Sequence, residues 1–180
     1  MFARHISLLL AGALLLPAAH ADERTARIDA SAVAGITLVL TPPMLHTRAP
    51  LNQKTLPVAG CTFTTAFQHD KHAAMLDILK RHLVDIPADE AARFLLRNAV
   101  YLRMTDGSTV RYLIGRADGP NGIVHGGSET GATASYLPFK SDEALLRALR
   151  EWAADGTAQK EPSSRCLDKR DFLQQGMPQP

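Results

Sequence analysis

The sequence has few cysteines, few aromatic residues and no large excess of charge of one sign. Its two cysteines, Cys61 and Cys166, do not form a Cys-x-x-Cys pair and are too few for a structural zinc site. Aromatic residues make up 6% of the chain, which disfavours a base-stacking surface or a sugar-binding cleft rich in Trp and Tyr. The composition therefore argues against thiol redox chemistry, zinc-stabilised folds and recognition by stacking.

The charges are nearly balanced. The chain has 20 basic and 18 acidic residues, a net charge of +2 with neutral histidines. Acidic and basic residues alternate along the sequence, whereas nucleic-acid-binding domains usually cluster basic residues on one face. We therefore expect no nucleic-acid partner.

The sequence has a single long hydrophobic run, at residues 6–16, and it follows Arg4. A run of 11 residues is shorter than the roughly 20 that a membrane-spanning helix needs. Ala19-His20-Ala21 supplies the small residues that a signal peptidase requires. We expect residues 1–21 to be a cleaved signal peptide, with a membrane anchor as the alternative. The mature form then begins at Asp22, has no transmembrane segment and is soluble in the periplasm or secreted.

Cleavage of 21 residues leaves 159 of the 180, which suits one domain. In an exported protein, two cysteines usually form a disulfide. Cys61 and Cys166 are 105 residues apart, and closing a loop of that length stabilises a fold by about 4–5 kcal/mol in the chain-entropy description. A buried Cys61 with a reactive Cys166 is the alternative.

The hydrophobic pattern predicts an α+β domain over residues 33–156, between a flexible segment at 22–32 and a tail at 157–180 pinned by Cys166. Strands are expected at 33–40, 58–67, 99–105 and 108–115, with 123–125 and 132–136 continuing the sheet around a turn at 126–131. Helices are expected at 70–84, 87–97 and 141–156. This grouping predicts a two-layer domain, with an antiparallel sheet of about five or six strands and about three helices packed on one face.

The strongest local signal is Asp106-Gly107, which lies between two alternating segments and suits a hairpin turn with positive φ. Strand alternation and the apolar stripes of the helices together predict the core. The expected core residues are Ile36, Leu38, Leu40, Phe63, Leu76, Leu79, Leu83, Phe94, Leu102, Val110, Tyr112, Ile114, Leu145, Leu149 and Trp152.

Histidines are the candidates for metal binding. His69 and His72 are three residues apart at the start of a predicted helix, a spacing that can chelate a transition metal. Asp70 could add an oxygen ligand, and His46 or His125 a third imidazole. The pair lacks a fixed-spacing motif such as His-Glu-x-x-His. The alternative is that these histidines lie on an exposed helix start or pack beside the core, and otherwise no cofactor is expected.

The glycine-rich segment 125–131 does not form a catalytic motif. A nucleophile elbow requires Gly-x-Ser-x-Gly, but Thr130 stands where the last glycine is required. A phosphate-binding loop requires a following Lys-Ser/Thr and a helix, which are absent here. We therefore predict no catalytic residue, and interpret the segment as a hairpin turn.

A binding function is the remaining interpretation. Residues 42–57 are rich in proline and form a long predicted loop, a feature that is often functional. We expect an exported, non-catalytic binding module that contacts another protein, such as an inhibitor, an immunity-type protein or an envelope accessory protein. Its candidate partner-binding residues are Leu45, His46, Arg48 and Leu51, unless this loop simply packs across the sheet. A small-molecule or metal carrier that uses His69 and His72, or an unrecognised hydrolase, is the alternative.

Overall fold

The structure is a computed structural model, and it describes residues 25, 27–42, 45–66, 68–118, 121–131, 136–155 and 159–160. The predicted signal peptide, Cys166 and most of the predicted tail lie outside the described residues. None of the described helices combines the length and the apolar character needed to cross a lipid bilayer.

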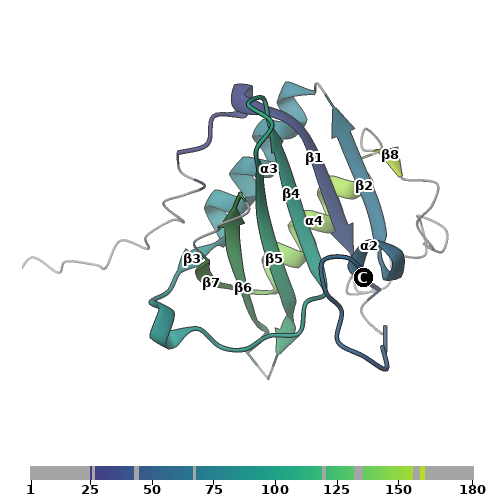
Figure 1. Cartoon of the computed structure of the whole chain (residues 1–180), viewed down its shortest axis with the longest axis vertical. Helices are drawn as coiled ribbons and strands as arrows, with labels where there is room; N and C mark the ends of the chain where they lie inside the picture. Colours follow the sequence, from purple (N-terminus) through teal and green to yellow (C-terminus); the bar gives the residue numbers. More distant parts are fainter. Residues whose placement is uncertain are drawn as a thin grey trace, which may run out of the picture.

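The centre of the fold is one antiparallel sheet of eight strands in the order β3-β7-β6-β5-β4-β1-β2-β8 (Figure 1). Six strands have five or more residues, and β3 and β8 have two each. The antiparallel α+β prediction is therefore confirmed. The strands are β1 (Val33–Leu40), β2 (Cys61–Ala66), β3 (Val84–Asp85), β4 (Asn98–Met104), β5 (Thr109–Asp118), β6 (Ile123–Thr130), β7 (Leu137–Ser141) and β8 (Gln159–Lys160).

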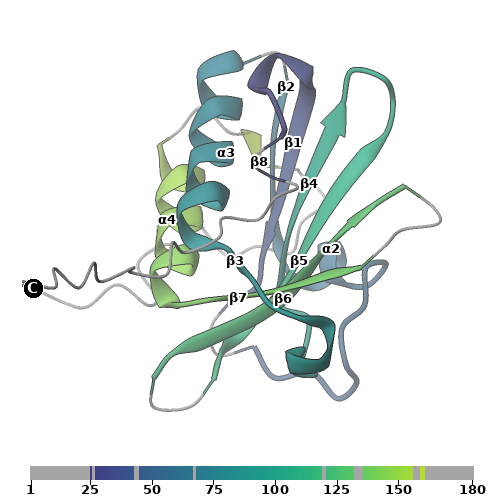
Figure 2. The ribbon, with the colours of Figure 1, turned by 90° about the vertical axis from the view of Figure 1, so that its left-hand side faces the viewer.

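Two long helices cover one face of this sheet, α3 (His69–His82) and α4 (Glu143–Ala154) (Figure 2). Asp142 caps the start of α4, because its carboxylate accepts a hydrogen bond from the Ala144 backbone N–H at 2.9 Å. Ser141, at which the helix over 141–156 was predicted to start, is instead the last residue of β7. The one-turn helix α2 (Leu56–Ala59) has Pro57 in its first turn, and β2 therefore starts at Cys61 rather than at residue 58.

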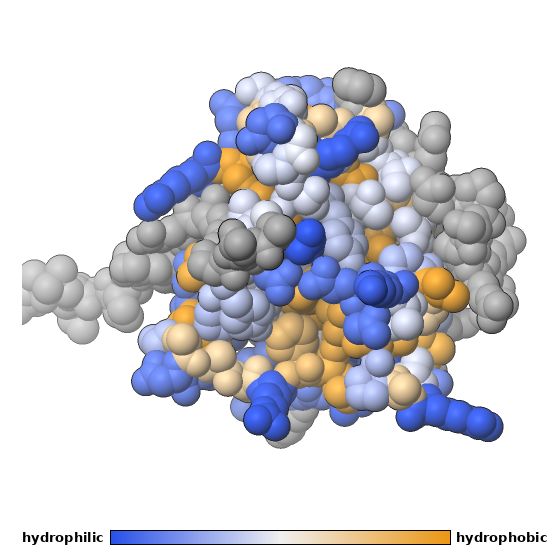
Figure 3. All heavy atoms as spheres, viewed as in Figure 1, coloured by the Kyte–Doolittle hydropathy of each residue, from blue (hydrophilic) through white to orange (hydrophobic). Residues whose placement is uncertain are grey.

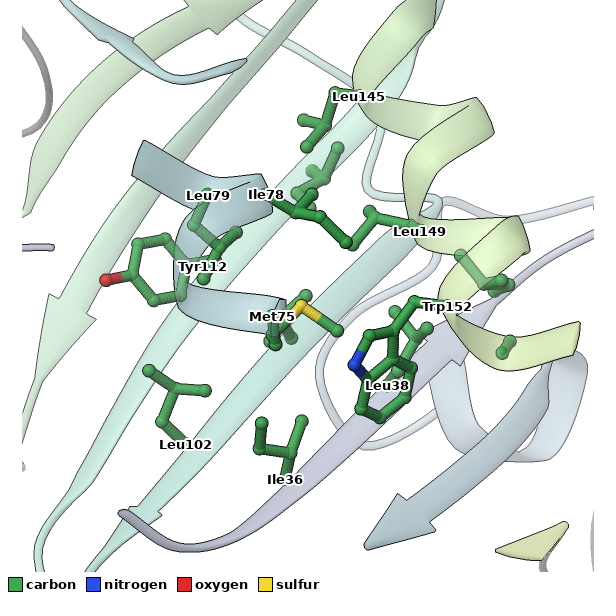
Figure 4. Close-up of a cluster of buried hydrophobic side chains, with 14 of the residues drawn as sticks. Ile36, Leu38, Met75, Ile78, Leu79, Leu102, Tyr112, Leu145, Leu149 and Trp152 are labelled. Atoms are coloured by element: carbon green, nitrogen blue, oxygen red, sulfur yellow. The ribbon is translucent and has the colours of Figure 1, made fainter. Parts of the chain in front are cut away.

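The main core lies between the sheet and these two helices (Figure 4). It joins Ile36 and Leu38 of β1 to Leu79 of α3 and Leu149 of α4. Of the predicted core residues, all are buried except Phe94, which is partly buried on the opposite face of the sheet. Periodicity therefore predicts which face of α3 and α4 is buried.

A smaller apolar cluster lies on the outer face of the sheet. It contains Val39, Ala99, Leu113 and Leu56, with Leu51 and other partly buried residues packed against them. Figure 3 shows this face, with hydrophobic residues gathered in its lower part below more hydrophilic ones. The sheet is therefore covered on one side by helices and in part on the other side by loop residues.

The prediction of a helix at residues 87–97 is wrong. Only a short 3-10 helix, η2 (Ala88–Glu90), forms there, and residues 91–97 are not helical. Phe94 and Leu96 pack on the outer apolar cluster, whereas Leu95 between them is 46% exposed. This alternation has the period of an extended chain, and tertiary packing has overridden the helical propensity of the segment.

The prediction of a turn at residues 126–131 is also wrong. Residues 126–130 belong to β6, and Gly131 follows the strand with φ of 71°. Gly126 and Gly127 lie where a Cβ atom would overlap the rings of Phe139 and Tyr136. The glycines therefore admit aromatic rings against the strand rather than bend the chain. The strand expected at 132–136 begins at Leu137, and residues 132–135 lie outside the described residues.

The Asp106-Gly107 hairpin forms as predicted. Gly107 has φ of 84°, and the Asp106 carboxylate accepts a hydrogen bond from the Ser108 backbone N–H at 2.8 Å. Within the segment expected to be flexible, η1 (Ala30–Ala32) leads into β1, and Thr25 is fully buried with its hydroxyl 2.6 Å from the Tyr112 hydroxyl. Thr25 is therefore part of the folded unit.

Candidate functional site

A pocket of about 590 Å³ opens at the end of the sheet where β1 and β5 finish and β4 begins, beside α4. This is the lower end of the sheet in Figure 1. The volume lies within the range of small-ligand sites, roughly 300–1,000 Å³. We call it the arginine pocket, and its lining is Thr41, Pro42, Leu45, His46, Arg97, Asn98, Arg116, Ala117, Asp118, Glu143, Leu146, Arg147 and Arg150.

Four arginines line the pocket, from three separate parts of the chain. Arg97 immediately precedes β4, and Arg116 lies in the last part of β5. Arg147 and Arg150 lie on α4 together with Leu146, at positions three and four residues apart that share one side of a helix. The basic wall is therefore a product of the tertiary fold.

Asn98 holds the base of the pocket in place. Its side chain is buried, its Oδ1 accepts a hydrogen bond from the Thr41 backbone N–H at 3.2 Å, and its Nδ2 donates to the Gly115 carbonyl at 3.2 Å. These two bonds join the end of β1 to β4 and β5. A buried amide with its groups satisfied is a rigid element, so this part of the lining is pre-formed.

An irregularity in β5 sets the direction of its last residues. The pairing of β5 with β6 shifts register between Ile114 and Ala117. Arg116 lies in the irregular stretch, and its Nε donates to Asp118 Oδ1 at 2.7 Å. Such irregularities redirect side chains and are frequent next to binding sites. The charge of Arg116 is balanced locally by Asp118.

Among the described residues, no carboxylate forms such an ion pair with the other pocket arginines. Arg97 Nη1 donates to the neutral Thr47 hydroxyl at 3.4 Å. Within the described part of the chain, neither Arg147 nor Arg150 forms an ion pair. Arg150 is partly buried, and burial lowers its pKa from the ordinary value, although the nearby Glu143 carboxylate opposes this effect. Among the residues that line the pocket, positive charges therefore outnumber negative ones.

The four predicted partner-binding residues fall into two groups. Leu45 and His46 line the arginine pocket, with Leu45 half-buried and His46 exposed. Arg48 is exposed but does not line the pocket, and Leu51 packs against the outer apolar cluster. The first part of the predicted loop thus reaches the pocket, and its later part packs on the sheet.

The structure gives the two histidines of the predicted metal site different environments. His69 is exposed, whereas His72 is 2% exposed and its Nε2 lies 3.1 Å from the Thr65 hydroxyl. Burial lowers the pKa of His72, and His69 lowers it further, while a hydrogen bond with the Val33 backbone opposes this effect. Over the described ranges, no group of three His, Cys, Asp or Glu side chains is placed to hold a metal ion. Metal binding by His69 and His72 stays a prediction, without support from these contacts.

Sequence reasoning missed the pocket arginines. Arg147 and Arg150 offered a weak signal, because two arginines one turn apart flank the apolar stripe of a predicted helix. Arg97 and Arg116 had no recognisable spacing relative to them. When the chain is compared with protein-family models, with curated protein sequences and with solved structures, none of them matches.

Proposed function

We propose that the chain is an exported, non-catalytic binding module that contacts another protein through the arginine pocket and the loop at its rim. The observation that carries this proposal is the position of Leu45 and His46, which lie in the lining of the pocket beside four arginines. Concave sites with apolar walls and convergent polar groups are the usual places for ligand binding.

The loop that leads to the pocket is held at its far end, which supports a recognition role. Asn52 Oδ1 accepts hydrogen bonds from the Lys54 and Thr55 backbone N–H groups, at 2.9 and 3.0 Å. Gln53 Nε2 donates to Glu129 of β6 at 3.1 Å. A loop that is ordered before binding loses less conformational entropy when a partner docks, so these contacts favour association.

Export and the disulfide belong to the same proposal. β8 pairs with β2 in antiparallel fashion, with Lys160 opposite Phe63, and its direction leads toward the Cys61 end of β2. Lys160 precedes Cys166 by six residues, a short enough separation for the pairing to favour a Cys61–Cys166 bridge.

Intact mass measurement of the exported protein should give a chain that begins at Asp22 and lacks two protons. A chain that retains residues 1–21 would contradict export by cleavage, and a fully reduced chain would contradict the bridge.

Site-specific photo-crosslinking in the producing cell tests the binding function. A photoreactive amino acid in place of His46, at the pocket rim, should yield one discrete crosslinked protein species. The same amino acid in place of His69, which is exposed on α3 and does not line the pocket, is the control. Absence of a crosslink at residue 46, or the same pattern at both positions, would contradict the proposed contact surface.

A further inference from the structure

The charges of the pocket are not balanced within it. Its lining contains four arginines and two carboxylates, those of Asp118 and Glu143. Because Arg116 pairs with Asp118, three arginines remain to face Glu143, an excess of two positive charges with His46 neutral. The whole chain carries a net charge of only +2. An excess of the same size is therefore concentrated in one concave site.

We infer that the partner group received by the arginine pocket is an acidic peptide segment with two neighbouring carboxylates beside an apolar side chain. This inference rests on the proposed function, because it names the chemistry of the partner. Two carboxylates would cancel the excess charge of the pocket. The partner side of the contact is thus identified by charge complementarity.

The arginines suit carboxylates in geometry as well as in charge. A guanidinium presents its N–H groups in a planar fork that matches the two oxygens of a carboxylate. Arg147 and Arg150 are three residues apart on α4, whereas Arg97 immediately precedes β4. Guanidinium groups from two parts of the fold are therefore available to two carboxylates of one ligand.

The apolar part of the lining indicates the third feature of the ligand. Leu146 belongs to the main core and also lines the pocket, and Leu45, Pro42 and Ala117 line it as well. These side chains offer hydrophobic contact but no charge. A ligand that carries an apolar side chain next to its carboxylates would use both kinds of surface, whereas a nucleic-acid backbone would use only the basic one.

A titration with a labelled peptide tests the inference on the mature, oxidised protein. The probe is a fluorescent Gly-Leu-Glu-Glu-Leu-Gly peptide, and its matched control has Gln in place of both Glu residues. Fluorescence anisotropy should show saturable binding of the Glu peptide, and binding at least about tenfold weaker for the Gln peptide, because charge-assisted hydrogen bonds are about twice as strong as neutral ones. Raising the salt from 50 to 300 mM should weaken the binding of the Glu peptide further.

Variants locate the binding. The double variant Arg147→Gln, Arg150→Gln should bind the Glu peptide at least about tenfold more weakly, because two charged contacts are removed. Arg93→Gln with Arg103→Gln is the matched control, because these arginines are exposed and do not line the pocket. The control should bind as the parent does, and thermal unfolding of both variants checks that the fold is intact.

Several results would overturn the inference. The Glu and Gln peptides could bind equally well, or binding of the Glu peptide could fail to saturate. The pocket and control variants could lose the same amount of affinity. Succinate alone could bind as tightly as the peptide, which would indicate a site for free small anions. The proposed function fails separately, when residue 46 gives no crosslinked protein. A crosslinked partner with no binding of the acidic peptide would therefore reject this inference and leave the binding function standing.

Discussion

Two cations, Lys71 of α3 and Arg150 of α4, have opposite surroundings. The Lys71 side chain is 9% exposed, pairs with Asp155, and donates to the Trp152 carbonyl at 3.0 Å. Its ammonium also lies 4.9 Å from the centre of the Trp152 ring, and the indole N–H donates back to the Lys71 carbonyl at 3.1 Å. Arg150, two residues before Trp152, has no ion pair in the part of the chain that the structure describes.

The comparison separates a structural cation from a candidate binding cation. At Lys71 the fold supplies a carboxylate, a carbonyl and an aromatic face, so the burial of the charge is compensated within the molecule. At Arg150 burial lowers the pKa, and the nearby Glu143 offsets this only in part. A buried charge that is not fully balanced in the free protein can be balanced by an oppositely charged ligand.

The largest effect is expected at Trp152, because its indole both fills the core and completes the contacts of Lys71. Trp152 is 4% exposed, and its replacement by Ala leaves a large cavity between α3 and α4. We expect Trp152→Ala to lower the free energy of unfolding by about 3–5 kcal/mol. Urea denaturation followed by circular dichroism measures this loss. A loss below about 1 kcal/mol, that of a mild substitution, would mean that the two helices do not depend on this contact.

A smaller loss is expected at Lys71 itself. Lys71→Met keeps an apolar stem but removes the hydrogen bond to the Trp152 carbonyl and the cation over the indole ring. Because Asp155 is 49% exposed, water can solvate the carboxylate that loses its partner. We therefore expect a loss of about 1–3 kcal/mol, the usual range for a buried group that loses its hydrogen-bond partner. Equal stability of Lys71→Met and the parent would remove the contrast with Arg150.

The sequence was sufficient to predict the helices and strands whose buried residues recur at a regular spacing. The stripe that contains Leu76 and Leu79 predicted the buried face of α3, and the Asp106-Gly107 turn predicted the central hairpin. Residues 91–97 were predicted wrongly because an apolar stretch of that length fits either a helix or an extended chain, and contact with the outer sheet face decided between them. The arginine pocket could not be predicted, since its basic residues meet only after the strand order and the irregularity in β5 are known.

Arg150→Met should separate binding from stability. Because this guanidinium has no ion pair among the described residues, an apolar replacement of similar length should change the free energy of unfolding by no more than about 0.5 kcal/mol in either direction. Binding of the acidic peptide should nevertheless fall at least about tenfold, which is about 1.4 kcal/mol. Denaturation and anisotropy measured on the same preparation test both parts. A loss of stability like that of Lys71→Met would show that Arg150 is also a structural cation.

The smallest effect is expected from pH, at the buried His72 near the start of α3. In the unfolded chain its imidazole takes up a proton as the pH falls through about 6.5. In the folded protein burial lowers the pKa of His72, so the unfolded state binds more protons and stability falls as the pH decreases below about 7. Below the folded-state pKa both states are protonated and the loss levels off. Thermal unfolding at pH 7.5 and 5.5 should therefore show a smaller pH-dependent decrease in His72→Gln than in the parent, whereas His46→Gln, at an exposed position that does not contribute to the His72 shift, should retain the parent's decrease. The same pH dependence in all three proteins would mean that the protonation of His72 is not linked to folding.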